Sequence, residues 1–300
     1  MTIDKLTTLR LSDFLAFCRS HRGAIDESFL SDDDLRDFVP DAENPTYVAV
    51  GDQDAIIGAA SLMNGPYYQR GRKGRFRIFH VLPPHDRGIY ADLLAHIAPD
   101  VPAMDDLYLF VRDDNALMRA VLESLDFSIE RYAYFMRREP GPVTAPQWDE
   151  GYVLRPLVFN RDEGDYCRVR NLGFSRLVGS QTPVTPDEVS RMQDAEDYLE
   201  AGIFLLYHDD TPVGVARTSK DTLEGESVLN IGPLALVPGY QGKGLGRQLL
   251  RAALSFGHAI GLATAVLSAN VDNENAIRLY VSEGFAPLET MVCYSWRRPT

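Results

Sequence analysis

Two copies of one α/β unit are predicted from three features of the sequence. In the second half, strand-like and helix-like apolar patterns alternate, which is typical of α/β proteins. The first half repeats this order more faintly. A Pro-rich stretch with few periodic apolar residues separates the halves at 140–151, and 300 residues exceed what one ordinary core uses. The expected domains are therefore 1–139 and 152–300.

The second half shows the clearer pattern. Its expected strands are apolar runs bounded by turn residues, and they cover 202–207, 213–217, 228–237, 265–269, 287–291 and 292–297. From Leu245 to about Ile260 apolar residues recur every three or four positions, which predicts an amphipathic helix. A second helix is expected from about Asn273 to Ser282, and Gly284 is placed to cap its end.

The first half matches the second residue by residue. Its expected strands cover 47–50, 55–63, 75–81 and 107–111, and its expected helices cover 89–97 and 115–125. Val81 corresponds to Val237 at a shift of 156, and Asn115 corresponds to Asn273 at a shift of 158. An internal duplication explains these matches.

The composition is that of a globular protein, with 45% hydrophobic and 24% charged residues. No apolar run approaches the length of a membrane span, and the first residues lack the pattern of a signal peptide, so no membrane association and a cytoplasmic location are expected. The net charge of −13 disfavours nucleic acid as a partner. The sequence carries no indication of the oligomeric state.

Cysteine usage gives no sign of a metal or a disulfide framework. Cys18, Cys167 and Cys293 are scattered, and none has the spacing of a metal ligand set. We expect three buried free thiols and no metal.

The most informative segment leads from a strand through a glycine loop into a helix. Glycines at 242, 244 and 246 allow successive backbone N–H groups to point at one spot, and the following helix start adds unpaired N–H groups. This arrangement is typical of a phosphate site, with Lys243 and Arg247 as nearby cations. Gly244 follows Lys243, so the hydroxyl of a Walker loop is missing, and the acidic residue of a dinucleotide fold is absent around 266–268.

Two motifs in this half resemble those of the Gcn5-related N-acetyltransferase (GNAT) family. Gln241, Gly244 and Gly246 match the loop motif Gln/Arg-x-x-Gly-x-Gly/Ala. The second motif is matched by Asn273, Ala276, Leu279, Tyr280, Gly284 and Phe285. The resemblance covers residues 152–296 and, more weakly, the first half. It implies two tandem domains, each a mixed sheet flanked by helices, of which the second is catalytic.

The resemblance also implies the cosubstrate, acetyl-CoA, and the residues that would hold it. Its pyrophosphate would lie on the loop, which is formed by Gln241, Gly242, Lys243, Gly244, Leu245, Gly246 and Arg247. The pantetheine arm would pair with the strand at Leu234, Ala235 and Leu236, near Asn273. Tyr280 would give a proton to the departing thiolate.

The general base is less clear, because Asn230 and Ser268 stand where some members of the family carry Glu. Either water relays the proton to a carboxylate such as Glu226, or the base lies on another segment. The first copy has Asp86 and only one of the three glycines, Gly88, and it has Leu122 in place of Tyr280. It is therefore expected to keep the fold without the reaction.

These features predict transfer of an acetyl group to a primary amine of a small molecule or peptide, by direct attack in a ternary complex. The alternative is a module of the same fold that binds coenzyme A or acts as a scaffold without catalysis.

Overall fold

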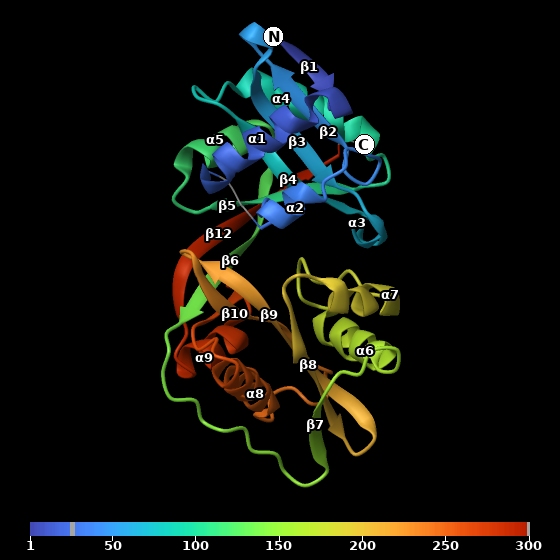
Figure 1. Cartoon of the computed structure of the whole chain (residues 1–300), viewed down its shortest axis with the longest axis vertical. Helices are drawn as coiled ribbons and strands as arrows, with labels where there is room; N and C mark the ends of the chain where they lie inside the picture. The colour runs from blue at the N-terminus through green and yellow to red at the C-terminus, as the bar shows by residue number, and fades with distance from the viewer. Residues whose placement is uncertain (25–27, 299–300) are drawn as a thin grey trace. The chain divides into compact units, whose positions relative to one another are not determined.

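The computed structural model describes residues 1–24 and 28–298, and the chain forms two compact units (Figure 1). The first unit holds residues 1–132 and the end of the chain from Thr290, and the second holds residues 133–289. The expected domains 1–139 and 152–300 remain a proposal about the two sequence copies. The compact units differ from those ranges, because the first unit takes in the end of the chain from Thr290 and the second takes in residues 133–139.

The first unit is a mixed sheet with helices on both faces (Figure 1). Its strand order is β1-β2-β3-β4-β5-β12, in which β4 and β5 run parallel. The strands are β1 (Thr2–Lys5), β2 (Thr46–Val50), β3 (Ile56–Met63), β4 (Lys73–Val81), β5 (Asp106–Arg112) and the end of β12 (Ala286–Arg297). The helices are α1 (Leu11–His21), α2 (Asp32–Arg36), α3 (Pro66–Gly71), α4 (Arg87–Ile97) and α5 (Ala116–Ser124), with 3-10 turns at Thr8–Arg10, Arg22–Ala24, Asp52–Asp54 and Ala98–Asp100.

Alternation of side chains along the strands builds two cores in this unit. Ala49 contributes to a cluster with α4 and α5, whereas its neighbours Val48 and Val50 contribute to a cluster with α1 and α2. Successive residues of a strand point to opposite faces, so each face of the sheet buries its own pair of helices.

The second unit repeats this architecture with strand order β6-β11-β10-β9-β8-β7, in which β10 and β11 run parallel. The strands are the end of β6 (Ser128–Arg138), β7 (Tyr152–Pro156), β8 (Tyr198–His208), β9 (Thr211–Leu223), β10 (Glu226–Leu236) and β11 (Ala265–Asn270). The helices are α6 (Glu163–Phe174), α7 (Pro186–Ser190), α8 (Leu245–Ala259) and α9 (Glu274–Ser282), with a 3-10 turn at Arg191–Asp194. Helix α8 buries Leu249 and Leu250 against the sheet, and α6 buries Tyr166 and Val169 within a separate cluster.

Each unit is completed by a strand from the other half of the sequence. In the second unit β6 pairs antiparallel with β11, from Arg138 opposite Ala265 to Ala133 opposite Asn270. In the first unit β12 pairs antiparallel with β5, from Met291 opposite Arg112 onward. Neither sheet is therefore built from one contiguous half of the chain.

Most sequence predictions of elements are confirmed. The helices at 245–260 and 273–282 are present, Gly284 has a left-handed φ of 93°, and the first half follows the predicted order. All three cysteines are buried and free. The prediction of two final strands is wrong, because β12 is one continuous strand. No Gly, Pro, Asn or Asp lies between Leu288 and Trp296, so nothing favours a turn there.

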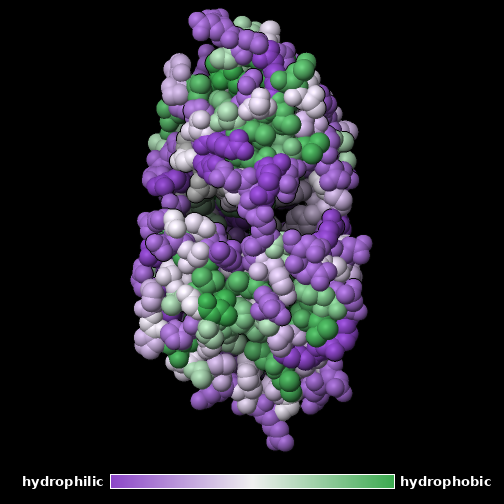
Figure 2. Space-filling view, viewed as in Figure 1, coloured by the Kyte–Doolittle hydropathy of each residue, from purple (hydrophilic) through white to green (hydrophobic). Residues whose placement is uncertain are grey.

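The surface agrees with the charged composition. On the face that Figure 2 shows, hydrophilic side chains cover much of the surface and hydrophobic ones form separate patches between them. Within residues 1–24 and 28–298, no helix combines the length and the apolar character needed to cross a membrane.

Candidate active site

Strands β10 and β11 diverge in the middle of the second unit. They pair only at Leu229 opposite Ala265 and Asn230 opposite Val266. Beyond this point the register of β10 shifts between Ile231 and Leu234, and β10 continues along β9 while β11 continues along β6. Within the described residues, the edge of β10 that faces β11 therefore has no strand partner over the segment 231–236, and its peptide groups are available to a ligand.

Leu234, Ala235 and Leu236 lie on this diverging segment. Ala235 and Leu236 are buried, and Leu234 is half-buried. A Cβ on Gly173, near the end of α6, would lie 2.9 Å from the Cβ of Ala235. Glycine at position 173 thus permits α6 to approach β10 closely at this point.

The glycine loop follows directly and leaves open space in front of its backbone. Gly242 and Gly244 have φ of 74° and 82°, a conformation that favours glycine. A Cβ built on Gly239, Gly242 or Gly244 would meet nothing within 4 Å. Gly244 is the N-cap of α8 and provides no side chain, so the first N–H groups of α8 have no side-chain cap. The loop can hold an anion through N–H groups alone.

Two contacts fix the loop to the sheet. The Gln241 amide donates a hydrogen bond to the Leu236 carbonyl at 2.9 Å. The Tyr240 hydroxyl lies 2.9 Å from Nδ1 of His208, at the end of β8. The Gln241 side chain therefore holds the loop in its conformation by this hydrogen bond, which requires a donor such as an amide at position 241.

The two cations near the loop differ in their availability. Lys243 is exposed and lies 5.1 Å from the centre of the Tyr240 ring. Arg247 instead pairs with Glu283, whose Oε1 is 2.5 Å from Arg247 Nη1 and 2.9 Å from Arg251 Nη2. Burial would raise the pKa of Glu283, but the hydrogen bonds from Arg251 and Arg247 outweigh it and hold the pKa below its ordinary value. Sequence reasoning missed Glu283, since it lies 36 residues from Arg247.

Helix α9 carries Asn273 and Tyr280. Asn273 is the N-cap, and its Oδ1 accepts a hydrogen bond from the Ala276 N–H at 3.3 Å. Tyr280 is half-buried and packs against Phe285, with ring centres 6.0 Å apart. Burial raises the pKa of Tyr280 to about 12, so its hydroxyl stays protonated at neutral pH. Tyr280 contacts the same apolar cluster as Leu267 of β11, on the face of the sheet that α8 and α9 cover.

Glu226 is not brought to this site. It is exposed at the first residue of β10, five residues before Ile231. At about 3.3 Å per residue this corresponds to roughly 17 Å along the strand. A side chain cannot bridge that distance.

A different carboxylate lies beside the point of divergence. The Asn230 amide donates a hydrogen bond to Oδ2 of Asp221 on β9, at 3.3 Å. Asn230 pairs with Ser219, two residues from Asp221, so all three side chains share one face of the sheet. Val215 of β9 lies on that same face, beneath α6. Only the strand register brings Asp221 to Asn230, and no local spacing in the sequence could have indicated it.

The loop between α6 and α7 lies at the end of β11. The Asn270 amide donates a hydrogen bond to the Val178 carbonyl at 2.9 Å. Asn171 is bonded twice to Val184, through its amide and its carbonyl oxygen, at 2.9 Å each. These contacts hold the loop over 175–184 near the mouth of the divergence. In the part of the chain that the structure describes, no group of three His, Cys, Asp or Glu side chains could hold a metal ion.

The sequence is similar to those of known acetyltransferases. Residues 174–285 match the model of the Acetyltransferase (GNAT) family. A mycothiol acetyltransferase of Frankia casuarinae is 27% identical over 233 residues, which cover 73% of this chain and 67% of that protein. One of Actinosynnema mirum is 34% identical over 168 residues, 55% of each chain. The chain thus spans about half to two thirds of the length of these relatives.

A solved structure resembles the whole chain. It is a tandem GNAT protein from the clavulanic acid biosynthesis pathway, with a TM-score of 0.71 and 16% sequence identity, and the match covers 100% of this chain and 99% of that chain. At this identity the likeness concerns the fold alone, including its duplication.

Proposed function

The chain belongs to the GNAT family of acetyltransferases, and we propose that its second unit transfers the acetyl group of acetyl-CoA to a primary amine of a small molecule or peptide. The observation that carries this proposal is the open, uncapped glycine loop at the start of α8, directly beyond the diverging segment of β10. A diphosphate joined to an extended amide-bearing arm has the shape and chemistry that these two features accept.

The residues of the loop fit a diphosphate. Backbone N–H groups of residues 242–246 would donate hydrogen bonds to its oxygens, and Lys243 would add positive charge. Arg247 would contribute only if its pairing with Glu283 loosened. Leu234, Ala235 and Leu236 would hold the arm by their peptide groups, with Gln241 keeping the loop in place and Asn273 keeping the start of α9 in place.

The acetyl thioester of the cosubstrate supplies the electrophile, and the surrounding residues would manage the protons. Tyr280, on the face covered by α9, would donate its proton to the departing sulfur. A peptide N–H on the free edge of β10 would stabilise charge on the thioester oxygen. The acid and the acceptor amine would then lie on opposite sides of the sheet.

For the base, Asp221 is better placed than Glu226. It lies on the face opposite Tyr280, next to the divergence, and Asn230 orients one of its oxygens. A water molecule beside Asn230 could pass the proton of the attacking amine to this carboxylate. Glu226 would need a chain of several water molecules over roughly 17 Å.

The similarity to mycothiol acetyltransferases favours a small-molecule amine as the acceptor. The acceptor would enter from the side of α6 and the loop over 175–184, because Tyr280 and α9 cover the other face. A primary amine of a peptide is the second class of acceptor that we propose.

Release of free thiol from acetyl-CoA tests the proposal, measured with purified protein and a panel of small primary amines and short peptides. Turnover with at least one amine, and its loss when Gly244 is replaced by Glu, would support it. Gly244→Glu adds a carboxylate to the loop, and Gly261→Glu, a positive-φ glycine with equally open surroundings outside the loop, is the matched control. Tight binding of coenzyme A without turnover on any amine would favour the non-catalytic alternative.

A further inference from the structure

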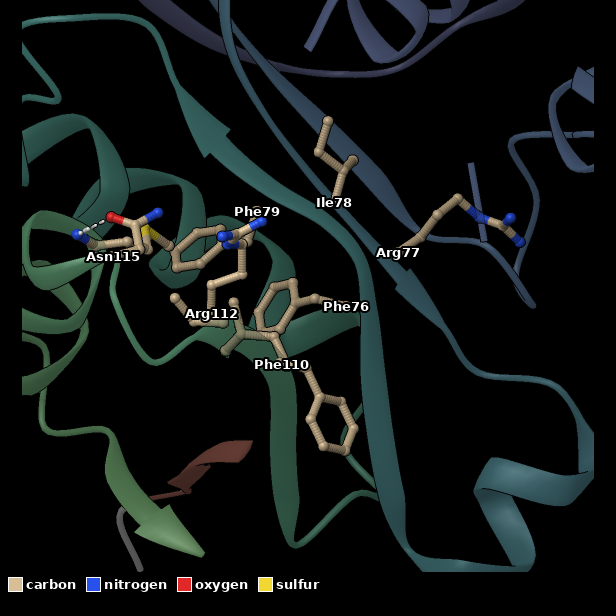
Figure 3. A pocket seen from close by; sticks show the side chains of 10 residues that line it. Phe76, Arg77, Ile78, Phe79, Phe110, Arg112 and Asn115 are labelled. Atoms are coloured by element: carbon tan, nitrogen blue, oxygen red, sulfur yellow. Dashed lines mark hydrogen bonds between the residues drawn. The ribbon is translucent and has the colours of Figure 1, made fainter. Parts of the chain in front are cut away.

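A pocket opens between β4 and β5 of the first unit (Figure 3). These strands pair only at Lys73 opposite Asp106, Gly74 opposite Leu107 and Arg75 opposite Tyr108, and then diverge. The divergence corresponds to that of β10 and β11, since Tyr108 lies 158 residues before Val266. About 440 Å³ of space not filled by atoms lies here, part of it open to solvent.

The walls of this pocket are apolar side chains and strand edges. Phe76, Phe79, Leu109, Val111 and Met118 contribute the apolar surface. Strand β4 pairs with β3 on its other side, and β5 pairs with β12. Among the described residues, no strand pairs with the facing edges beyond Arg75 and Tyr108. An amide or carbonyl group of a ligand would form hydrogen bonds with the strand edges. Apolar groups beside it would pack against the apolar side chains.

The polar side chains of the pocket lining already have hydrogen-bond partners within the chain. Arg77 contributes backbone to the lining, but its side chain points away (Figure 3) and donates a hydrogen bond to the Phe29 carbonyl at 2.9 Å. Arg112 pairs with Asp114 at 2.9 Å. Asn115 uses its Oδ1 to cap α5, by accepting from the Met118 N–H at 3.0 Å. The lining thus favours a neutral ligand over an ionic one.

A phosphate-bearing ligand is excluded at the end of the pocket. The Asp86 carboxylate accepts a hydrogen bond from the Gly88 N–H at 2.7 Å and caps α4, where α8 has no side-chain cap. A diphosphate at that helix start would meet a negative charge. Tyr90 stands where the second unit has Gly246, and its hydroxyl accepts a hydrogen bond from the Val81 N–H at 3.1 Å. Its ring packs against Phe79, which lines the pocket, with ring centres 5.1 Å apart.

We propose that the pocket of the first unit binds a short, neutral, phosphate-free compound with an amide or thioester group and a small apolar end. It accepts the acyl end of a thioester and rejects the nucleotide that the second unit would hold. This inference concerns binding only and does not require turnover in the second unit.

Methionine methyl groups provide reporters for a direct test. Met118 lines the pocket, whereas Met136 lies in the core of the second unit beside Leu267. Full-length protein with ¹³C-methyl methionine would be titrated with S-acetyl-N-acetylcysteamine and, separately, with acetyl-CoA. Met118→Leu assigns the reporter signal. Val111→Phe fills the pocket, and Val153→Phe, at an exposed position on β7, is the matched control.

The expected result is a saturable shift of the Met118 signal with S-acetyl-N-acetylcysteamine and none with acetyl-CoA at the same concentration. Val111→Phe should weaken that binding at least about tenfold, and Val153→Phe should not. If Val111→Phe fails to fold by thermal melting, Leu109→Phe replaces it. An unshifted Met118 signal, or an equal shift with acetyl-CoA, would overturn the inference. Failure of the proposed function would be seen separately, as no response of Met136 to acetyl-CoA.

Discussion

Oε1 of Glu283 lies 2.5 Å from Nη1 of Arg247, and the same carboxylate bonds to Arg251, so one half-buried acid holds two cations of α8. Glu283 follows α9, and this cluster therefore joins the two helices that carry the candidate loop and the candidate acid. The pairing also withholds Arg247 from an anion at the loop. A diphosphate bound at the loop would therefore compete with Glu283 for the Arg247 guanidinium.

Glu283→Gln is expected to weaken the pairing with Arg247 and so to leave this guanidinium available to the anion. The amide keeps the shape but loses the charge, so acetyl-CoA should bind about threefold more tightly, equal to roughly 0.6 kcal/mol. The free energy of unfolding should fall by about 1–2 kcal/mol, because a charged hydrogen-bond network is weakened. Calorimetric titration and urea unfolding measure the two effects. Glu274→Gln, which alters an exposed pair with Arg278, is the control and should change neither quantity. Weaker binding of acetyl-CoA to Glu283→Gln would contradict the competition.

Tyr280→Phe should lower kcat by about 10- to 100-fold while the Kd for acetyl-CoA stays within twofold. The ring packing against Phe285 is kept, and only the hydroxyl proton is lost. Because burial raises the pKa of Tyr280 to about 12, the wild-type acid should stay protonated up to pH 10, and the ratio of the two kcat values should not vary between pH 7 and 10. Steady-state rates across this range check both statements. Equal kcat values would remove Tyr280 from the mechanism.

Asp221→Asn should reduce kcat by about 100-fold or more at neutral pH, and the loss should shrink as the pH rises. At high pH the acceptor amine loses its proton to solvent, and no base is then required. A purely structural defect would not be relieved in this way. Glu226→Gln is the matched control, since it changes an exposed carboxylate at the far end of β10. A large loss in Glu226→Gln, with normal turnover in Asp221→Asn, would return the base to the position expected from the sequence.

The sequence predicted the loop and the two helices of the second unit because their signals are local. Glycines at alternating positions and an apolar period of three to four residues each lie within one short segment. Asp221 beside Asn230 could not be predicted, because it depends on the exact register of β9 and β10, and Glu283 beside Arg247 could not, because helix packing brings together residues 36 positions apart. The bounds of helix α6 could not be predicted either, since buried charged residues such as Glu163 and Arg170 interrupt its apolar pattern.

The exchange of β6 and β12 could not be read from the sequence either, because each strand has the apolar pattern that either sheet would accept. It predicts that residues 1–139 and 152–300, expressed separately, do not fold alone. The first fragment lacks the β12 partner of β5, and the second lacks the β6 partner of β11. Each would expose a long unpaired strand edge. Circular dichroism and thermal melting of the fragments test this, with the two co-expressed fragments as the control. A cooperative melt of either fragment alone would contradict it.

We predict that His80 makes the first unit sensitive to acid. It is 5% exposed at the end of β4, and burial, followed by the charges of His21 and His85, lowers its pKa to about 4. The rings of His21 and His85 lie 5.4 and 5.7 Å from it. An unfolded chain binds the proton at an ordinary pKa of about 6.5, whereas the native state binds it only near 4, so stability falls as the pH drops through this interval.

The size of this effect follows from the two pKa values. A difference of about 2.5 pH units corresponds to roughly 3 kcal/mol of unfolding free energy, present above pH 6.5 and lost by pH 4. His80→Gln should remove most of that dependence, because a neutral amide takes the place of the imidazole. His96→Gln, an exposed histidine of α4, is the matched control and should keep the full slope. Urea unfolding of the three proteins at half-unit steps from pH 7 to pH 4 measures the slopes. Parallel curves for wild type and His80→Gln would show that the acid sensitivity resides in other groups.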